Sequence, residues 1–337
     1  MLWKAVVSVR DRLGILEDGL SLRQRLVLIT FTVIGLAVVP LIIESGFLLD
    51  MFIMVFLFTG LGHAWNIVGG YTGQISLGHA IMWGIGAYTT MYMYINFGIT
   101  PYVGIFIGGF AGALSGLLLG FATFRLEGHY FAMATLAAGI VAHLAFQQFE
   151  AVGGATGLRY EIGVWDEPWS FTFASNEPYF YVTGVFALLI TGYMFMMDRS
   201  RLAVYLKAIK MDQTLAENAG IDVFRYKMYA MGISSFITGV AGGLYAQYLL
   251  FINPDSVFYI LRHIDILLIS VVGGIGTVIG PLFGAAIYMP IRSLTRTYLS
   301  GNLTGVGWIV FGVLLVLISM YRPQGLLGED TWGDRNK

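Results

Sequence analysis

Residues 69–80 read Gly-Gly-Tyr-Thr-Gly-Gln-Ile-Ser-Leu-Gly-His-Ala, a glycine-rich and polar stretch between two long apolar runs. Its glycines relax the backbone, and Gln74, Ser76 and His79 carry groups that a lipid-facing helix excludes. Such a break at membrane depth is tolerated only where protein or a water-filled path covers it. The stretch therefore predicts a polytopic membrane protein folded around a passage. Gln74, Ser76 and His79 are candidates to line it; the open alternative is that they satisfy local backbone groups.

The composition agrees with a membrane protein. The 337 residues are 57% hydrophobic and 12% charged, whereas a soluble domain carries roughly 25% charged residues, and the mean hydropathy is +0.75. A net charge of −1 argues against a nucleic-acid-binding protein. Because the chain has no cysteine, disulfides and thiolate metal sites are excluded. The five histidines are scattered, so we expect no metal site and no cofactor.

The apolar runs predict an all-α, polytopic inner-membrane protein with about ten spans, since a span needs about 20 apolar residues. We expect residues 1–25 to be a cytoplasmic segment, residues 26–320 the transmembrane domain and residues 321–337 a cytoplasmic tail. Glycines interrupt the last third, which favours broken or re-entrant segments there. The ten predicted spans are 26–43, 47–68, 81–96, 101–123, 130–149, 179–197, 228–251, 264–279, 282–299 and 306–320.

The distribution of Lys and Arg gives an orientation. With both termini in the cytoplasm, only four of the 19 basic residues lie outside, namely Arg159, Arg262, Arg292 and Arg296. That bias fits the positive-inside rule. Residues 150–178 are then a periplasmic loop, and residues 198–227 are a basic cytoplasmic loop.

One span carries a small-residue repeat. Glycines fall at every fourth position of residues 101–123, so they line one helix face and allow another backbone to approach closely. We favour helix packing over ligand binding for this face, which comprises Gly108, Gly112, Gly116 and Gly120.

The basic loop 198–227 has helical features of its own. Apolar residues recur at helical spacing in its first half. Asp212 is placed to cap a short helix over 213–219, which Gly220 can end. An exposed capped helix suits docking into a groove on a partner; the alternative is an ordinary positive-inside loop.

From about residue 60 to residue 328 the chain resembles the permeases of branched-chain amino acid ABC importers of the LivM type. Six motifs occur in the expected order, with Val152 in place of the family's threonine before the third. The motifs are Gly70-Tyr71-Thr72-Gly73-Gln74-Ile75-Ser76-Leu77-Gly78-His79-Ala80, continued by Gly84-Ile85-Gly86-Ala87-Tyr88; Gly128-His129-Tyr130-Phe131-Ala132-Met133-Ala134-Thr135-Leu136; Gly153-Gly154-Ala155-Thr156-Gly157; Ala216-Glu217-Asn218-Ala219-Gly220-Ile221; Val272-Gly273-Gly274-Ile275-Gly276-Thr277 with Gly280-Pro281; and Arg322-Pro323-Gln324-Gly325-Leu326-Leu327.

The resemblance implies a multi-subunit importer. Such a permease pairs with a second, LivH-like permease, binds two cytoplasmic ABC ATPase subunits and receives an aliphatic amino acid from a periplasmic binding protein. It also implies that the segment containing Leu215, Ala216, Glu217, Gly220 and Ile221 couples the ATPases to the spans. Polar side chains on the path would accompany the zwitterionic head of the substrate, and the candidates are Gln74, Ser76, His79 and Thr135. For Thr135 the alternative is a hydrogen bond to its own helix.

No catalytic motif is present. The chain lacks a phosphate-binding loop and the common hydrolase motifs, so we expect a non-enzyme that draws on ATPase partners. The alternatives are a permease for urea or short amides, and a stand-alone secondary transporter or channel. A proton- or sodium-coupled carrier usually keeps ionisable residues deep in the membrane, and few acids occur within these spans. His63 and His143 are isolated histidines on apolar helices, so we expect each to form an interhelical hydrogen bond. Asp265 is expected to form a cluster with Arg262 and His263.

Overall fold

The structure, a computed structural model, describes residues 40, 43, 45–160, 169–299 and 326–327. The chain divides into two compact units, residues 1–50 and 51–337, and the packing described below lies within the second. In the described part the fold is all-α apart from one pair of two-residue strands. Five of its helical segments are long and apolar enough to cross a membrane: 46–71, 101–123, 128–148, 177–198 and 254–273.

Each predicted span between residues 47 and 299 corresponds to a helix. The bounds of 101–123 match α5, whereas 264–279 was placed too late, because α12 begins at Ile260 and a glycine turn follows Gly273. The spans 26–43 and 306–320, the segment 1–25 and most of the tail 321–337 lie outside the described residues. The main elements are α3 (Gly46–Asn66), η1 (Ile67–Tyr71), α4 (His79–Phe97), α5 (Pro101–Thr123), α6 (Gly128–Gln148), η2 (Glu150–Val152), η3 (Gly154–Thr156), β1 (Leu158–Arg159), α7 (Glu177–Asp198), α8 (Arg201–Met211), α9 (Gln213–Asn218), α10 (Val223–Leu249), β2 (Phe251–Ile252), α11 (Pro254–Val257), α12 (Ile260–Gly273) and α13 (Gly280–Leu299).

Helices α4, α5 and α10 pack backbone against backbone. A Cβ atom at Gly86 of α4 would lie 2.1 Å from the carbonyl oxygen of Gly239 of α10, and one at Gly112 of α5 would lie 2.9 Å from the Gly239 Cα atom. Such distances leave no room for any side chain, and close approach of this kind is typical of glycines in membrane helices. The opposite face of α5 exposes large apolar side chains suited to lipid, including Phe106, Phe110, Leu114 and Leu118.

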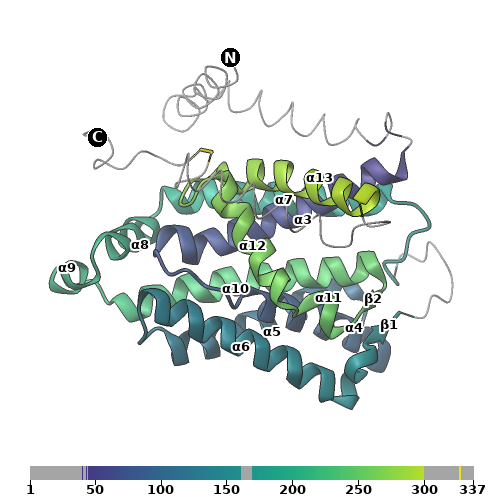
Figure 1. Ribbon diagram of the computed structural model, residues 1–337, viewed down its shortest axis with the longest axis horizontal. Helices are drawn as coiled ribbons and strands as arrows, with labels where there is room; N and C mark the ends of the chain where they lie inside the picture. The colour runs from purple at the N-terminus through teal and green to yellow at the C-terminus, as the bar shows by residue number, and fades with distance from the viewer. Residues whose placement is uncertain (1–39, 41–42, 44, 161–168, 300–325, 328–337) are drawn as a thin grey trace. The chain divides into compact units, whose positions relative to one another are not determined.

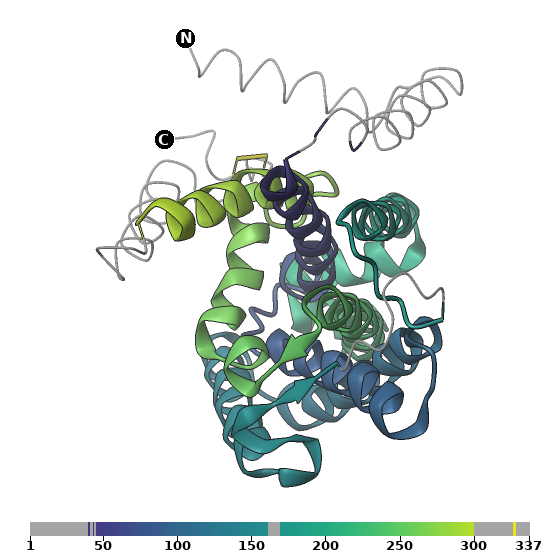
Figure 2. The same cartoon turned by 90° about the vertical axis from the view of Figure 1, so that its right-hand side faces the viewer.

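The two ends of the bundle carry different short elements (Figure 1), and Figure 2 looks directly at the end that carries the two strands. Helices α8 and α9 lie at one end, here called the α8 end. At the other, β1 pairs antiparallel with β2, with Leu158 opposite Ile252, and α11 follows; we call it the strand end. The β1–β2 pair ties the loop after α6 to the end of α10.

Candidate functional site

The glycine-rich stretch forms a non-helical segment, residues 72–78, between η1 and α4. It starts at the α8 end, where the Tyr71 hydroxyl donates to Asp198 at 2.8 Å and Gly73 lies beside Lys210 of α8. It ends inside the bundle, where the Leu77 N–H donates to the Thr135 hydroxyl at 3.0 Å. Thr135 lies about 10 Å from the start of α6 at 1.5 Å per residue. The segment therefore rises from the α8 end into the helix bundle.

Side chains of this segment alternate in direction. Gln74 and Ser76 are buried, with 4% and 1% of their surface exposed, whereas Gly73 is exposed and Ile75 is 50% exposed. The inward side is held by Trp65, whose indole N–H donates to the Ser76 carbonyl at 2.8 Å. The segment thus has one edge packed on α3 and one edge facing outward.

The remaining predicted polar residues brace this segment on its buried side. His79 is buried, with Nε2 at 2.9 Å from the Ser234 hydroxyl of α10 and Nδ1 at 3.1 Å from the Ser76 hydroxyl. Ser234 in turn donates to the Ala64 carbonyl of α3 at 2.6 Å. Thr135 accepts from Leu77 and also donates to Ala132 of its own helix at 3.0 Å. The structure buries the side chains of Gln74, Ser76, His79 and Thr135. It joins Ser76 to His79 and Thr135 to the Leu77 N–H, whereas the Gln74 side-chain oxygen has no hydrogen-bond partner among the described residues.

A second turn at the α8 end is held by Asn66, a residue that was not predicted from the sequence. Asn66, the last residue of α3, accepts from the Gly276 N–H at 2.7 Å and donates to the Thr277 carbonyl at 2.8 Å. These two bonds fix the glycine turn between α12 and α13 against η1. The position of an asparagine at the end of an apolar run was the available sequence signal for this role. Its two partners could not be identified from it, because they are 210 and 211 residues further along the chain.

The basic loop forms the helices that its sequence indicates. The Asp212 carboxylate caps α9 by accepting from the Leu215 N–H at 2.9 Å. At the other end Gly220 has φ +84° and donates to the Glu217 carbonyl at 2.9 Å, while Ile221 donates to the Ala216 carbonyl at 3.0 Å. This pair of bonds is the Schellman arrangement, which favours glycine because of its positive φ. Of the predicted coupling residues, Ala216 is buried, Ile221 is half-buried, and Leu215, Glu217 and Gly220 are exposed.

Helix α9 is joined to α10 by a buried lysine. The Lys227 ammonium donates to the Gln213 amide oxygen at 2.8 Å, and the lysine is only 1% exposed. Lys227 precedes the predicted span 228–251. Burial lowers the pKa of Lys227, and the charges of Glu127 and Glu217 oppose that shift. A buried donor that loses its acceptor carries the full desolvation penalty, so α9 and the first turn of α10 are expected to move as one body.

An ion cluster links α12 to α13. Asp265 is buried and pairs with Arg262 at 3.5 Å, as predicted, and also with Arg292 of α13 at 2.7 Å. Tyr288 of α13 donates a hydrogen bond to the same carboxylate. The predicted third member, His263, instead faces α6, where a Cβ at Gly139 would lie 2.7 Å from its Nε2 atom.

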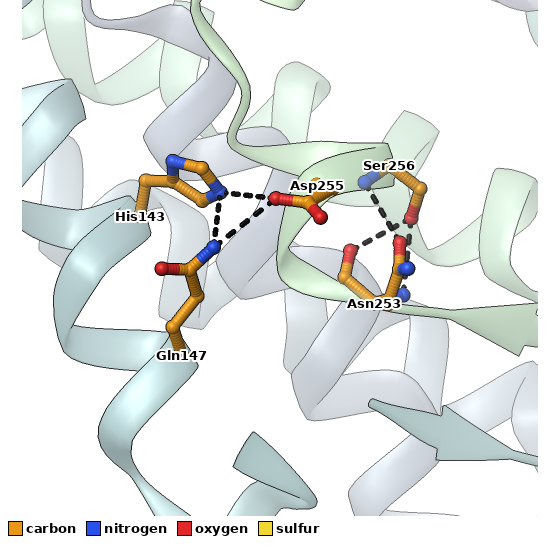
Figure 3. Close-up of polar contacts among 5 residues, drawn as sticks. All are labelled: His143, Gln147, Asn253, Asp255 and Ser256. Carbon is orange, nitrogen blue, oxygen red and sulfur yellow. Dashed lines mark hydrogen bonds and ion pairs between the residues drawn. The ribbon is translucent and has the colours of Figure 1, made fainter. Parts of the chain in front are cut away.

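Another polar group lies at the strand end (Figure 3). His143 and Gln147 of α6 both reach Asp255 of α11, with nitrogen-to-oxygen distances of 2.8 and 3.2 Å. The prediction of an interhelical bond is therefore confirmed for His143, and also for His63, whose Nε2 lies 3.1 Å from the Thr191 hydroxyl of α7. Within the described ranges, no group of three or more His, Asp and Glu side chains is arranged to hold a metal ion.

Comparison with known proteins gives a consistent result. Residues 45–319 match the family described as the branched-chain amino acid transport system permease component. The high-affinity branched-chain amino acid transport system permease protein LivM of Salmonella typhimurium is 29% identical, over 97% of this chain and 81% of the relative. LivM of Escherichia coli K12 is also 29% identical, over 92% and 76%. A probable LivH permease of Methanocaldococcus jannaschii is 27% identical over 73% and 80%. No solved structure matches the chain.

Proposed function

The chain belongs to the branched-chain amino acid transport system permease family, and from that premise we propose how its parts act in transport. It is a multi-pass, non-catalytic permease component of an ABC transport system for branched-chain amino acids. We propose about ten spans in the inner membrane with both termini in the cytoplasm. The α8 end then faces the cytoplasm and the strand end faces the periplasm, which agrees with the excess of Lys and Arg in the loop 198–227.

The proposed partners are those that the family implies, and the orientation assigns each to a side of the membrane. A LivH-like permease completes the transmembrane part, two ABC ATPase subunits bind at the α8 end, and a periplasmic binding protein delivers the substrate at the strand end, including the loop 150–178. The lipid bilayer covers the exposed apolar face of α5. ATP binding and hydrolysis on the partners drive alternating access, because this chain has no phosphate-binding loop of its own.

The observation that carries the coupling proposal is the construction of α9. This helix is closed by Asp212 at one end and by Gly220 at the other, and it presents the exposed side chains of Leu215 and Glu217. The bond between Lys227 and Gln213 joins it to α10, which continues through the bundle. A short, rigid, exposed helix attached to a long buried one transmits a push from an ATPase into the spans.

The pathway is proposed to run along the segment 72–78. Ser76, His79 and Thr135 form polar contacts that support this segment, and we propose that the buried side chain of Gln74 accompanies them along the path. A break in helical structure at membrane depth needs a protein or water-filled environment, and a pathway between two permeases supplies it.

Co-purification from the native membrane in mild detergent, with mass spectrometry of the bound proteins, tests the assembly. Recovery of two ATPases with phosphate-binding loops and a second permease is the expected result. A chain that purifies alone and transports without ATP would contradict the proposal.

A double variant tests the coupling. Glu217→Arg with Gly220→Pro reverses the exposed charge and places proline where φ is +84°, a conformation that proline cannot adopt. We expect a loss of substrate-stimulated ATP hydrolysis of about tenfold or more, since the coupling helix loses both its charge and its C-terminal turn, with membrane insertion retained. Glu217→Asp, which keeps the charge, is the control. Normal stimulation in the double variant would remove α9 from the coupling path.

A further inference from the structure

The outward edge of the segment 72–78 takes no part in the hydrogen bonds that hold this segment to α3, α6 and α10. Gln74 and Ser76 turn inward, while Gly73 and Ile75 lie on the outer surface of the chain. Resting on the proposed function, we propose that this outward edge lines the translocation pathway: the Ile75 side chain contacts the aliphatic side chain of the passing amino acid, and the backbone of the exposed residues Gly73 and Ile75 solvates its zwitterionic head.

Few backbone groups of the segment 73–76 form hydrogen bonds within the chain. Among the described residues, the N–H and carbonyl groups of Gly73 and Ile75 form no hydrogen bond. The neighbouring N–H groups are satisfied from within the chain, since Gln74 donates to the Thr72 hydroxyl at 3.4 Å and Leu77 to Thr135. Among the described residues the Ser76 N–H and the Gln74 carbonyl also form no hydrogen bond, so unpaired backbone groups run along residues 73–76 and include both residues of the outward edge.

These unpaired groups lie between the α8 end, where Gly73 is beside Lys210, and the level at which Leu77 meets Thr135. The segment runs from the level of α8 up to Thr135 and Ser234, which are about 10 and 16 Å into α6 and α10 at 1.5 Å per residue. Unpaired backbone groups that face lipid are strongly unfavourable. The outward edge must therefore meet a polar environment in the assembled protein.

An apolar partner helix cannot supply that environment. The backbone of a packed helix is already bonded within itself, so an apolar helix of a partner leaves these groups unsatisfied. Water satisfies them, and so does a small zwitterion, whose carboxylate accepts from N–H groups and whose ammonium donates to carbonyls. The exposed Ile75 side chain adds an apolar contact beside them. This combination fits an aliphatic amino acid moving through a water-filled path.

Cysteine substitution tests the proposal directly, because the natural chain contains no cysteine. Ile75→Cys is the probe, and the inward-facing Ser76→Cys and Gln74→Cys are matched controls on the same segment. Each variant is assembled with its partner subunits in proteoliposomes and treated with a charged methanethiosulfonate, which reacts with thiolates in water. We expect Ile75→Cys to react about tenfold faster or more than either control, because exposure governs thiol reactivity. Saturating leucine with binding protein and ATP should slow that reaction severalfold.

Two results would overturn the assignment. If Ile75→Cys reacts in the isolated chain but not in the assembled transporter, the partner permease covers the edge. If Ser76→Cys reacts as fast as Ile75→Cys, the alternation of the segment is not the one described here. Failure of the proposed function has a different signature, since the assembled complex would then show no leucine uptake before any substitution is made.

A second variant measures transport without labelling. Ile75→Trp enlarges the side chain on the outward edge, and we expect leucine uptake to fall by about tenfold or more, because the larger ring occupies the path, with the subunits still co-purifying. Leu114→Trp makes a comparable change on the exposed face of α5, where Leu114 is 61% exposed, and is expected to leave uptake unchanged. Uptake by Ile75→Trp equal to that of Leu114→Trp would contradict the proposal.

Discussion

Replacing Gly86 by alanine tests the packing of α4, α5 and α10 most sharply. The added Cβ atom would lie 2.1 Å from the Gly239 carbonyl oxygen and 2.6 Å from the Gly239 Cα atom. Both neighbours are backbone atoms, so no side chain can rotate away to relieve the overlap. The two helices must separate by about 1 Å to restore ordinary contact distances, and cavities then open along the whole interface.

The size of the effect follows from a matched comparison. At Gly192 of α7 an added Cβ atom would have no other atom within 4 Å, so Gly192→Ala keeps the gain in helix propensity of about 1 kcal/mol. Gly86→Ala has the same gain but adds an overpacking cost of about 1–3 kcal/mol or more. At roughly 2–4 °C per kcal/mol, the two variants should melt about 2–12 °C apart, with Gly86→Ala the less stable.

The measurement is thermal unfolding of each purified variant in the same detergent, followed by the loss of the monodisperse peak in size-exclusion chromatography. Wild-type protein and Gly192→Ala serve as references. If Gly86→Ala melts at or above the temperature of Gly192→Ala, the close approach of α4 and α10 does not limit stability, and the packing interpretation is wrong.

Two further predictions concern single hydrogen bonds. Thr135→Val removes the acceptor of the Leu77 N–H and should lower the free energy of unfolding by about 1–3 kcal/mol, since a buried donor is left unpaired; Thr123→Val, whose hydroxyl bonds only to its own helix, should change it much less in the same melting assay, and equal effects would contradict the bracing role. Lys227→Met keeps the length of the side chain but removes its bond to Gln213. We expect the ratio of ATP hydrolysis with and without substrate to fall severalfold in the assembled transporter, and an unchanged ratio would show that this bond is not needed for coupling.

The helices could be predicted from the sequence because their length is set by an external constraint. A hydrocarbon core of about 30 Å demands about 20 apolar residues, and the run 101–123 begins with a proline at the first helical position. The predicted bounds of the spans were less accurate where glycines and prolines lie close together in the sequence. Helix α12 ends at Gly273 in a glycine turn, whereas the predicted span ran on to residue 279.

Side-chain direction in the segment 72–78 could not be predicted in the same way. The residue types indicated a polar break, but a non-helical backbone has no fixed period to say which side chains turn inward. That choice depends on Trp65 and Thr135, which hold the Ser76 carbonyl and the Leu77 N–H from two other helices. The same limit applies to the contacts of Asn66 and Asp265 with residues of distant segments, because these contacts leave no local sequence signal.

Helix α10 connects the two regions on which the proposed mechanism depends. Lys227 joins its first turn to α9, and Ser234, about 10 Å further along at 1.5 Å per residue, bonds to His79 at the inner end of the segment 72–78. Gly239 packs tightly against the backbones of α4 and α5. We therefore expect a displacement of the first turn of α10 to move the rest of the helix with it. A shift of α10 along its axis would move Ser234 relative to His79 and misalign the 2.9 Å bond between them. A force on α9 therefore changes the contact between α10 and His79 that supports the segment 72–78. This is the coupling between the ATPases and the pathway that alternating access requires.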